Sequence, residues 1–203
     1  MKLKTTRELD KLVVLAAFWS LLAVASPASA DQPAGGSAEE GLKRLCETAP
    51  CRRNVEFTLK KRDGSDFVYR TPLAPPVVQP AYITVYPGET LYFEAAEGSG
   101  GDLELRLVPA IAHPEKTFVM NLVQKQGIGD GTGMTFEIKN PFKKRVRYHL
   151  ELMPLEKEIV IKSSTCPIME GLTNFEFWPY PIFQVLIEKV RFMDPAEPAS
   201  CIE

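Results

Sequence analysis

The chain has 203 residues, of which 24 are Lys or Arg and 26 are Asp or Glu, and 45% are hydrophobic. This balance of charge provides no basic surface for nucleic acid, so no nucleic-acid partner is expected. The apolar content is sufficient for one domain with a buried core, and the length does not require a second.

Residues 1–30 have the pattern of a secretory signal peptide. Basic residues precede the apolar run Leu12–Ala25, and Ala28-Ser29-Ala30 has the form of a cleavage site. The run is shorter than the roughly 20 residues that a membrane-spanning helix needs. We therefore predict cleavage after Ala30 and a periplasmic or secreted protein, with an uncleaved anchor as the alternative. Cleavage removes four basic and two acidic residues and leaves a net charge of −4.

The next segments differ in composition. Residues 31–44 begin with a stretch rich in Gly, Ala and Pro that is typical of a flexible tether, and Ser37 and Glu40 have the spacing of a helix-capping box. Residues 45–193 are predicted to form a single β-sandwich domain. Residues 194–203 form a proline-containing tail.

Four cysteines, Cys46, Cys51, Cys166 and Cys201, follow the predicted signal peptide. Thiols in an oxidising compartment tend to pair, so we expect two disulfides, although four cysteines allow three pairings. The spacing favours Cys46–Cys51 and Cys166–Cys201, and the second bond would attach the tail to the domain. No Cys-x-x-Cys motif is present for thiol redox catalysis.

Apolar residues alternate with polar ones along most of the chain after Val55, with turn residues such as Asp63-Gly64 and Pro87-Gly88 between the runs. The four prolines of Thr71–Pro80 predict an extended connector or a covered edge. The predicted strands are 55–60, 67–70, 82–86, 90–95, 103–108, 118–123, 134–139, 146–153, 159–163 and 182–192. About nine or ten short strands predict an all-β protein, an immunoglobulin-like or cupredoxin-like antiparallel β-sandwich.

The strand–turn–strand segment Tyr82–Phe93 resembles the hairpins of cupredoxins and other extracytoplasmic sandwiches. The resemblance covers this one hairpin, assigns no family, and makes copper the first metal to consider. A blue-copper site needs two histidines and a cysteine, usually with a histidine soon after the cysteine. Here Cys166 is followed by Met169 but not by a histidine. No metal or cofactor is therefore expected, and a copper-binding protein remains an alternative.

Catalytic motifs are not evident. The chain has no Gly-x-Ser-x-Gly elbow, no His-Glu-x-x-His and no phosphate-binding glycine loop before a helix. Its only histidines are His113, in a polar loop, and His149, which the alternation of strand 146–153 places on the outer face as a solvated side chain. A periplasmic hydrolase that uses His113 or His149 is the alternative from a different functional class.

The segment Phe175–Phe183 contains five aromatic residues and two prolines, which restrict its backbone. Such a segment can bind a sugar, an extended peptide or a partner protein. The other interpretation is that it folds over one end of the sandwich as a lid on the core. The candidate binding residues are Phe175, Phe177, Trp178, Tyr180 and Phe183.

Four cations, Lys143, Lys144, Arg145 and Arg147, follow the turn residues Asn140-Pro141. They predict either a weak contact with anionic lipid or the solvated end of a strand. Taken together, the sequence predicts an exported, non-catalytic binding or assembly module of the bacterial cell envelope. Its partner would be a protein or glycan component of that envelope.

Overall fold

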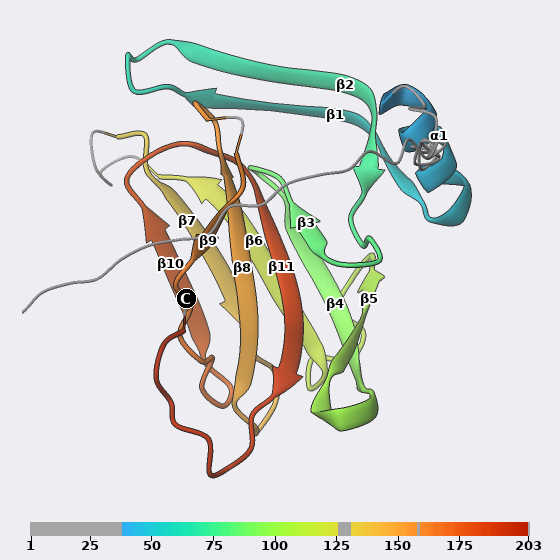
Figure 1. The fold of residues 1–203 in the computed structure, drawn as a ribbon, viewed down its shortest axis with the longest axis vertical. Coiled ribbons are helices and arrows are strands. Elements are labelled where there is room, and N and C mark those ends of the chain that lie inside the picture. The colour runs from blue at the N-terminus through green and yellow to red at the C-terminus, as the bar shows by residue number, and fades with distance from the viewer. Residues whose placement is uncertain (1–37, 126–130, 158, 203) are drawn as a thin grey trace, which may run out of the picture. The chain divides into compact units, whose positions relative to one another are not determined.

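The computed structural model describes residues 38–125, 131–157 and 159–202, which belong to one compact unit (Figure 1). The predicted signal peptide, Ser37 of the predicted capping box and most of the glycine-rich loop 127–133 lie outside these residues. Within them, no helix has the length and hydropathy needed to span a bilayer.

The described residues form one α-helix, a short 3-10 helix and eleven strands. Helix α1 spans Ala38–Thr48, and the 3-10 helix η1 spans Ser99–Gly101. The strands are β1 (Cys51–Lys60), β2 (Asp66–Pro76), β3 (Ile83–Val85), β4 (Thr90–Glu97), β5 (Leu103–Val108), β6 (Thr117–Gln124), β7 (Met134–Lys139), β8 (Val146–Pro154), β9 (Ile161–Ser163), β10 (Thr173–Trp178) and β11 (Ile182–Phe192). The prediction of an all-β protein is confirmed, and β10 is the strand that sequence patterning missed.

The strands form three antiparallel sheets. A five-stranded sheet has the order β10-β7-β6-β4-β5, a four-stranded sheet has the order β3-β11-β8-β9, and β1 pairs only with β2. In Figure 1 the four-stranded sheet lies in front of the five-stranded sheet, and the β1–β2 hairpin crosses one end of both. This is the antiparallel sandwich that the strand pattern predicts.

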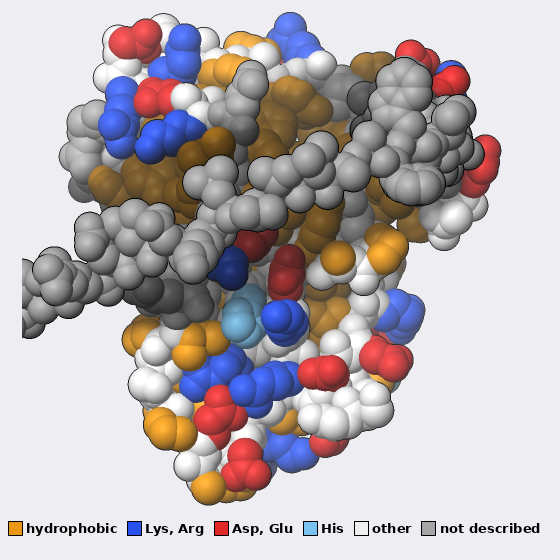
Figure 2. Space-filling view, viewed as in Figure 1, with side chains coloured by type: hydrophobic (Ala, Val, Ile, Leu, Met, Phe, Trp, Pro, Cys, Tyr) orange, Lys and Arg blue, Asp and Glu red, His pale blue; other side chains and the backbone are white. Residues whose placement is uncertain are grey.

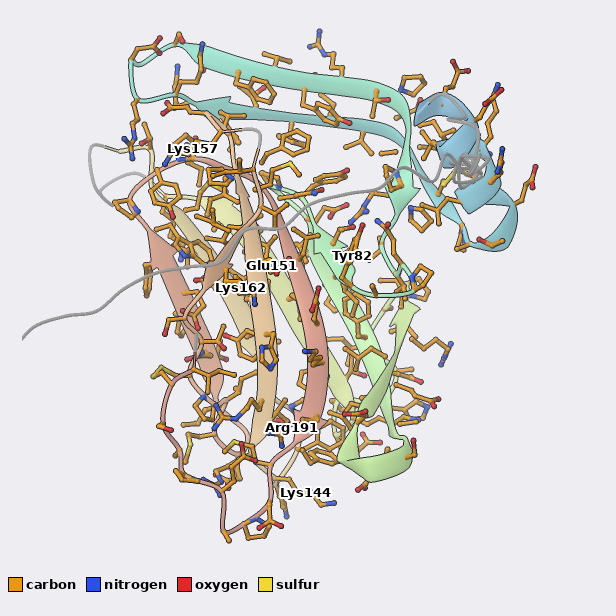
Figure 3. The ribbon with its side chains drawn as sticks, in the orientation of Figure 1. Tyr82, Lys144, Glu151, Lys157, Lys162 and Arg191 are labelled. Carbon is orange, nitrogen blue, oxygen red and sulfur yellow. A yellow bond between two sulfur atoms is a disulfide. The ribbon has the colours of Figure 1, made fainter. Side chains whose placement is uncertain are left out.

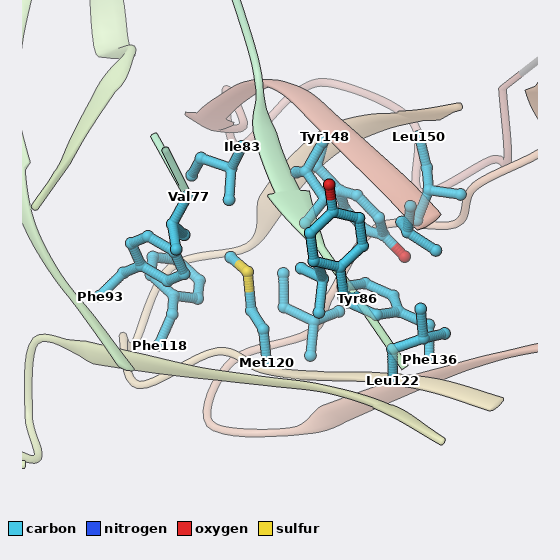
Figure 4. Close-up of a cluster of buried hydrophobic side chains, with 14 of the residues drawn as sticks. Val77, Ile83, Tyr86, Phe93, Phe118, Met120, Leu122, Phe136, Tyr148 and Leu150 are labelled. Carbon is cyan, nitrogen blue, oxygen red and sulfur yellow. The ribbon is translucent and has the colours of Figure 1, made fainter. Parts of the chain in front are cut away.

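The core lies between the inner faces of the two larger sheets. Phe93, Phe118 and Phe136 come from the five-stranded sheet, and Tyr148 and Leu150 come from β8 (Figure 4). All five side chains are almost completely excluded from water. Because alternate residues of a strand point to opposite faces, the odd–even alternation read from the sequence is the pattern that fills this core.

The β1–β2 hairpin turns at Asp63-Gly64 as predicted. Gly64 has a φ of 81°, a left-handed conformation that glycine adopts without steric cost, and its N–H donates to the carbonyl of Lys61 at 2.9 Å. Strand β2 continues to Pro76 and so includes much of the predicted connector. Prolines fit here because β2 pairs only with β1, and its other edge needs no N–H donors.

A largely buried ion pair joins the hairpin to the sandwich. Arg52 of β1 donates from Nε and Nη2 to both carboxylate oxygens of Glu89, at 2.7 and 2.9 Å, and from Nη2 to the carbonyl of Thr84 at 2.6 Å. Its guanidinium also lies 4.6 Å from the centroid of the Tyr86 ring. The hydrogen bonds compensate for the cost of burying the charge and hold the hairpin at this end of the sandwich.

Both disulfides have the predicted pairing. Cys46–Cys51 joins α1 to the start of β1, and Cys166–Cys201 attaches the C-terminal tail, where Thr165 and Ile202 also form a β-bridge. No cysteine is free. Paired thiols of this kind are typical of proteins in an oxidising, extracytoplasmic compartment.

Candidate binding surface

The predicted aromatic segment divides into a strand and a turn that have different environments. Strand β10 pairs antiparallel with β7, with Phe175 opposite Glu137 and Phe177 opposite Thr135. Phe175 and Phe177 point outward and are 47% and 56% exposed, whereas Trp178 points inward and is 7% exposed. In β10 the usual arrangement of apolar residues inside and polar residues outside is therefore inverted at Phe175 and Phe177, which face solvent.

The two exposed phenylalanines form one continuous apolar surface. Their rings stack with centroids 6.3 Å apart and planes inclined by 14°. Residues two apart in a strand share a face, so the backbone of β10 sets this spacing. Neighbouring exposed apolar side chains of this kind make the pair a candidate contact surface.

Polar residues on the inner side of β10 explain why the strand has this orientation. The Tyr148 hydroxyl donates to Glu176 Oε1 at 2.8 Å, and Asn174 Nδ2 donates to the same oxygen at 3.0 Å. Burial raises the pKa of the Glu176 carboxyl, although these hydrogen bonds oppose the shift. Burial likewise raises the pKa of Tyr148. Because this partly buried network needs Glu176 and Asn174 on the inner side, the alternate residues Phe175 and Phe177 must lie outside.

The other three aromatic residues are not part of the exposed surface, which corrects the prediction that all five belong to one surface. Trp178 is in the core, and its Nε1 donates to the hydroxyl of Ser163 at 3.2 Å. Tyr180 is half-buried under the guanidinium of Arg62, at 5.7 Å from its ring centroid. Phe183 makes edge-on contacts with Phe67 and Tyr69 of the hairpin and with Tyr86, which follows β3. Trp178 is in the core, and Tyr180 and Phe183 pack against it, so that of the five candidate residues only Phe175 and Phe177 are exposed.

The predicted cationic cluster is also divided. Arg147 is 4% exposed, because the tail covers it and accepts hydrogen bonds from it at the carbonyls of Pro198 and Ser200. The Arg147 side chain is therefore not available for the predicted lipid contact. Glu197 of the tail contacts both Arg147 and Arg191, and the hydrogen bonds from Arg191 lower the pKa of Glu197 to about 2.

The other cations of this segment lie at an open cleft of about 880 Å³. Lys144 pairs with Glu97 at 3.3 Å, and Arg145 donates to the carbonyls of Asp194 and Pro195. Lys143 is exposed. Lys144 and Arg191 lie at the same end of the sandwich in Figure 3. Lys144 and Arg145 already interact with an acidic group and with tail carbonyls, which weakens the case for an anionic ligand.

The two histidines do not meet. His113 is in the loop before β6, 3.7 Å from Glu115, whereas His149 is on the outer face of β8. His149 is half-buried rather than solvated as predicted, and burial lowers its pKa. Ser163 lines the same small pocket, but it lies opposite the inward-facing Leu150, and its hydroxyl accepts from Trp178. The serine therefore faces away from His149, so the two do not form a nucleophile–base pair.

Charged residues dominate the face around His149. Glu151 on β8 lies directly opposite Lys162 on β9 (Figure 3). Glu188 of β11 is paired with His149 in the ladder between β11 and β8. Figure 2 shows acidic and basic side chains gathered with a histidine on this face of the molecule. This mixture of charges contrasts with the apolar Phe175/Phe177 surface.

A metal centre is not supported by the described residues. They contain no cluster of three or more His, Cys, Asp or Glu side chains with metal-binding geometry. Blue copper requires a thiolate ligand, and the sulfur of Cys166 is bonded to Cys201. Asp130, the acidic residue of the glycine-rich loop, lies outside the described residues.

The fold and surface define a disulfide-linked, all-β sandwich with an aromatic edge strand. No protein-family model matches the chain, and no curated protein or solved structure is significantly similar to it. The case for a function therefore depends on the chemistry of the molecule itself.

Proposed function

We propose that the protein is an exported, non-catalytic binding or assembly module of the bacterial cell envelope, and that Phe175 and Phe177 form its contact surface. The observation that supports this most is the stacked, exposed ring pair on the edge strand β10. Its partner belongs to the envelope and is a protein or a glycan, both of which bind to flat aromatic surfaces.

The contacts that hold β10 in place support the proposal. Trp178, the buried neighbour of Phe177, and the network of Glu176, Tyr148 and Asn174 hold β10 from its inner side. A contact surface fixed in this way loses little conformational entropy on binding. The sandwich serves as the scaffold, and β10 carries the contact.

Export is part of the same proposal. The two disulfides support an oxidising compartment, and the pattern of residues 1–30 supports a cleaved signal peptide. N-terminal sequencing of the exported protein should begin near Asp31. A chain that starts at Met1 in the membrane fraction would contradict cleavage.

The contact surface can be tested with a photo-crosslinking amino acid in place of Phe177 in the native envelope. We expect one adduct of defined mass, whose partner is identified by mass spectrometry. The matched control replaces Val68, which is 48% exposed on the hairpin strand β2. Identical adducts from the two positions, or none from position 177, would refute the assignment of the surface.

A double substitution, Phe175→Ser with Phe177→Ser, tests the same point without a crosslinker. Both rings are about half exposed, so the melting temperature should change little while partner capture is lost. Retained capture by this variant would show that the contact lies elsewhere.

A further inference from the structure

The edges of the two larger sheets are protected, with one exception. Strands β3 and β9 have three residues each, and β5 carries the exposed charges Glu104 and Arg106. Short length and charge are the usual devices that prevent edge-to-edge pairing. Strand β10 has six residues, with no proline, no bulge and no charge on its outer face.

The backbone of β10 has an unused edge. Among the described residues, its ladder partner is β7 alone, and residues 173–178 make no backbone hydrogen bond to another segment. Each unpaired N–H and C=O along such an edge can bond to an added strand. The exposed rings of Phe175 and Phe177 border this edge.

We propose that β10 pairs antiparallel with β10 of a second copy of this chain, so that two five-stranded sheets become one continuous sheet around a two-fold axis. The inference rests on the proposed function, because it takes the same contact surface and names its partner. Two-fold pairing requires a strand that is complementary to itself, and β10 meets this requirement in one register.

The side chains select that register. Directly opposite residues share a face of the sheet. The two-fold axis must therefore lie at one residue of β10, which is then opposite the same residue of the second copy, and not between two consecutive residues, which point to different faces. An axis at Glu176 would place two carboxylates opposite each other, which is unfavourable. An axis at Asn174 would place Phe177 opposite Gly171, which has a φ of 68° and lies in the turn before β10.

An axis at Phe175 avoids both problems. It pairs the whole segment 173–177, with Phe175 opposite Phe175 of the second copy and Thr173 opposite its Phe177. On the inner face, Asn174 lies opposite Glu176 of the second copy, so that a neutral amide rather than a second carboxylate faces this carboxylate. The four phenylalanines then form one aromatic row across the junction, where neighbouring rings attract by more than area burial alone.

Cysteine crosslinking tests this register. Opposite Cβ atoms of an antiparallel pair lie about 4.5–5.5 Å apart, close to the spacing that a disulfide spans. In the exported protein with its native disulfides intact, Phe175→Cys should form a disulfide-linked dimer on mild oxidation. Phe177→Cys alone should link at least about tenfold more slowly, because its opposite residue is Thr173, whereas a mixture of Thr173→Cys and Phe177→Cys chains should link to each other.

Sedimentation equilibrium gives a second measurement that needs no new cysteine. The wild-type protein should show a concentration-dependent monomer–dimer equilibrium, and Phe175→Lys should raise its dissociation constant at least about tenfold, because two lysines would oppose each other. A wild-type protein that is monomeric at all concentrations, or Val68→Cys chains that crosslink as fast as Phe175→Cys chains, would overturn the inference.

The photo-crosslinking experiment separates the two proposals. An adduct from position 177 that contains only a second copy supports both. An adduct with a different envelope component, from a protein that is monomeric in solution, overturns self-pairing and leaves the contact surface intact. No adduct at position 177 together with no dimer refutes both.

Discussion

At the residue scale, the two neighbours Phe177 and Trp178 show how strongly position in a strand determines the role of a side chain. They are adjacent in sequence and similar in chemistry, yet one is 56% and the other 7% exposed. Thr135, directly opposite Phe177 on β7, has a buried hydroxyl that makes no hydrogen bond within the described residues. If the Phe177 ring were removed, water could reach the Thr135 hydroxyl. We therefore expect the protein to tolerate the loss of this ring.

We therefore predict opposite outcomes for the two substitutions. Trp178→Ala should lower the free energy of unfolding by about 3–5 kcal/mol, because it leaves a cavity and removes the hydrogen bond to Ser163. Phe177→Ala should change it by no more than about 0.5 kcal/mol. Urea denaturation followed by circular dichroism measures both. Equal losses would mean that the exposed ring is part of the core.

Glu176 provides a pH-dependent prediction. Burial raises the pKa of the Glu176 carboxyl in the folded state above its ordinary value of about 4.5, so the folded protein holds the proton more tightly than the unfolded chain. The resulting stabilisation is complete below about pH 4.5 and is lost as the pH rises through the folded-state pKa. Glu176→Gln removes this titration, so the melting temperature of the variant relative to wild type should rise between about pH 4 and pH 7.

The control for this prediction is Glu104→Gln, which removes one carboxylate from an exposed position on β5. Differential scanning calorimetry at several pH values compares the three proteins. A melting-temperature difference between Glu176→Gln and wild type that stays constant across this range would show that Glu176 has no raised pKa.

At the element scale, the hairpin β1–β2 depends on a few buried contacts because it shares no ladder with either larger sheet. The side chains of Arg52 and Glu89 are 7% and 23% exposed. No sequence pattern indicates this pair, since the two residues are 37 positions apart and both types are usually on the surface. Strand β10 was missed because its apolar residues, Phe175 and Phe177, lie on the outer face and its polar residues lie on the inner face. Only contacts with distant residues such as Tyr148 explain this orientation.

Loss of the counter-charge should destabilise the hairpin. Glu89→Ala leaves the Arg52 guanidinium buried without an acidic partner, and we expect a loss of about 3–5 kcal/mol in unfolding free energy. Glu56→Ala is the matched control, because Glu56 forms an ion pair with Arg70 on the same hairpin and both side chains are more than half exposed. That pair should contribute less than about 1 kcal/mol. Chemical denaturation distinguishes the two, and comparable losses would contradict a buried role for Glu89.

At the scale of the whole molecule, the disulfide Cys166–Cys201 connects the tail to the segment beside β10. The tail in turn covers Arg147 and supplies Glu197, which contacts Arg147 and Arg191. The segment that supplies the partners of the buried Arg147 is therefore attached to the domain both by one covalent bond and by these polar contacts.

Replacing both cysteines by serine should lower the unfolding free energy by about 3–4 kcal/mol, because the bond closes a long loop in the unfolded chain. The same change in Cys46 and Cys51, which are five residues apart, should cost only about 2 kcal/mol. Limited proteolysis should cleave the tail in the first variant and not in the second. A tail that resists cleavage in both would show that the hydrogen bonds of Arg147 hold it without the disulfide.

The sequence by itself determined the all-β class, most of the strands and the turns at Gly64 and Gly88, because these depend on local alternation and backbone conformation. It only favoured one of three pairings of the cysteines, and the structure decided between them. The tertiary structure decided which aromatic residues are exposed and which cations are buried. Phe175 lies outside because Glu176 bonds to Tyr148, and Arg147 is buried because the tail returns over it. Contacts between residues far apart in the chain carry no local pattern, so these roles could be assigned only from the folded molecule.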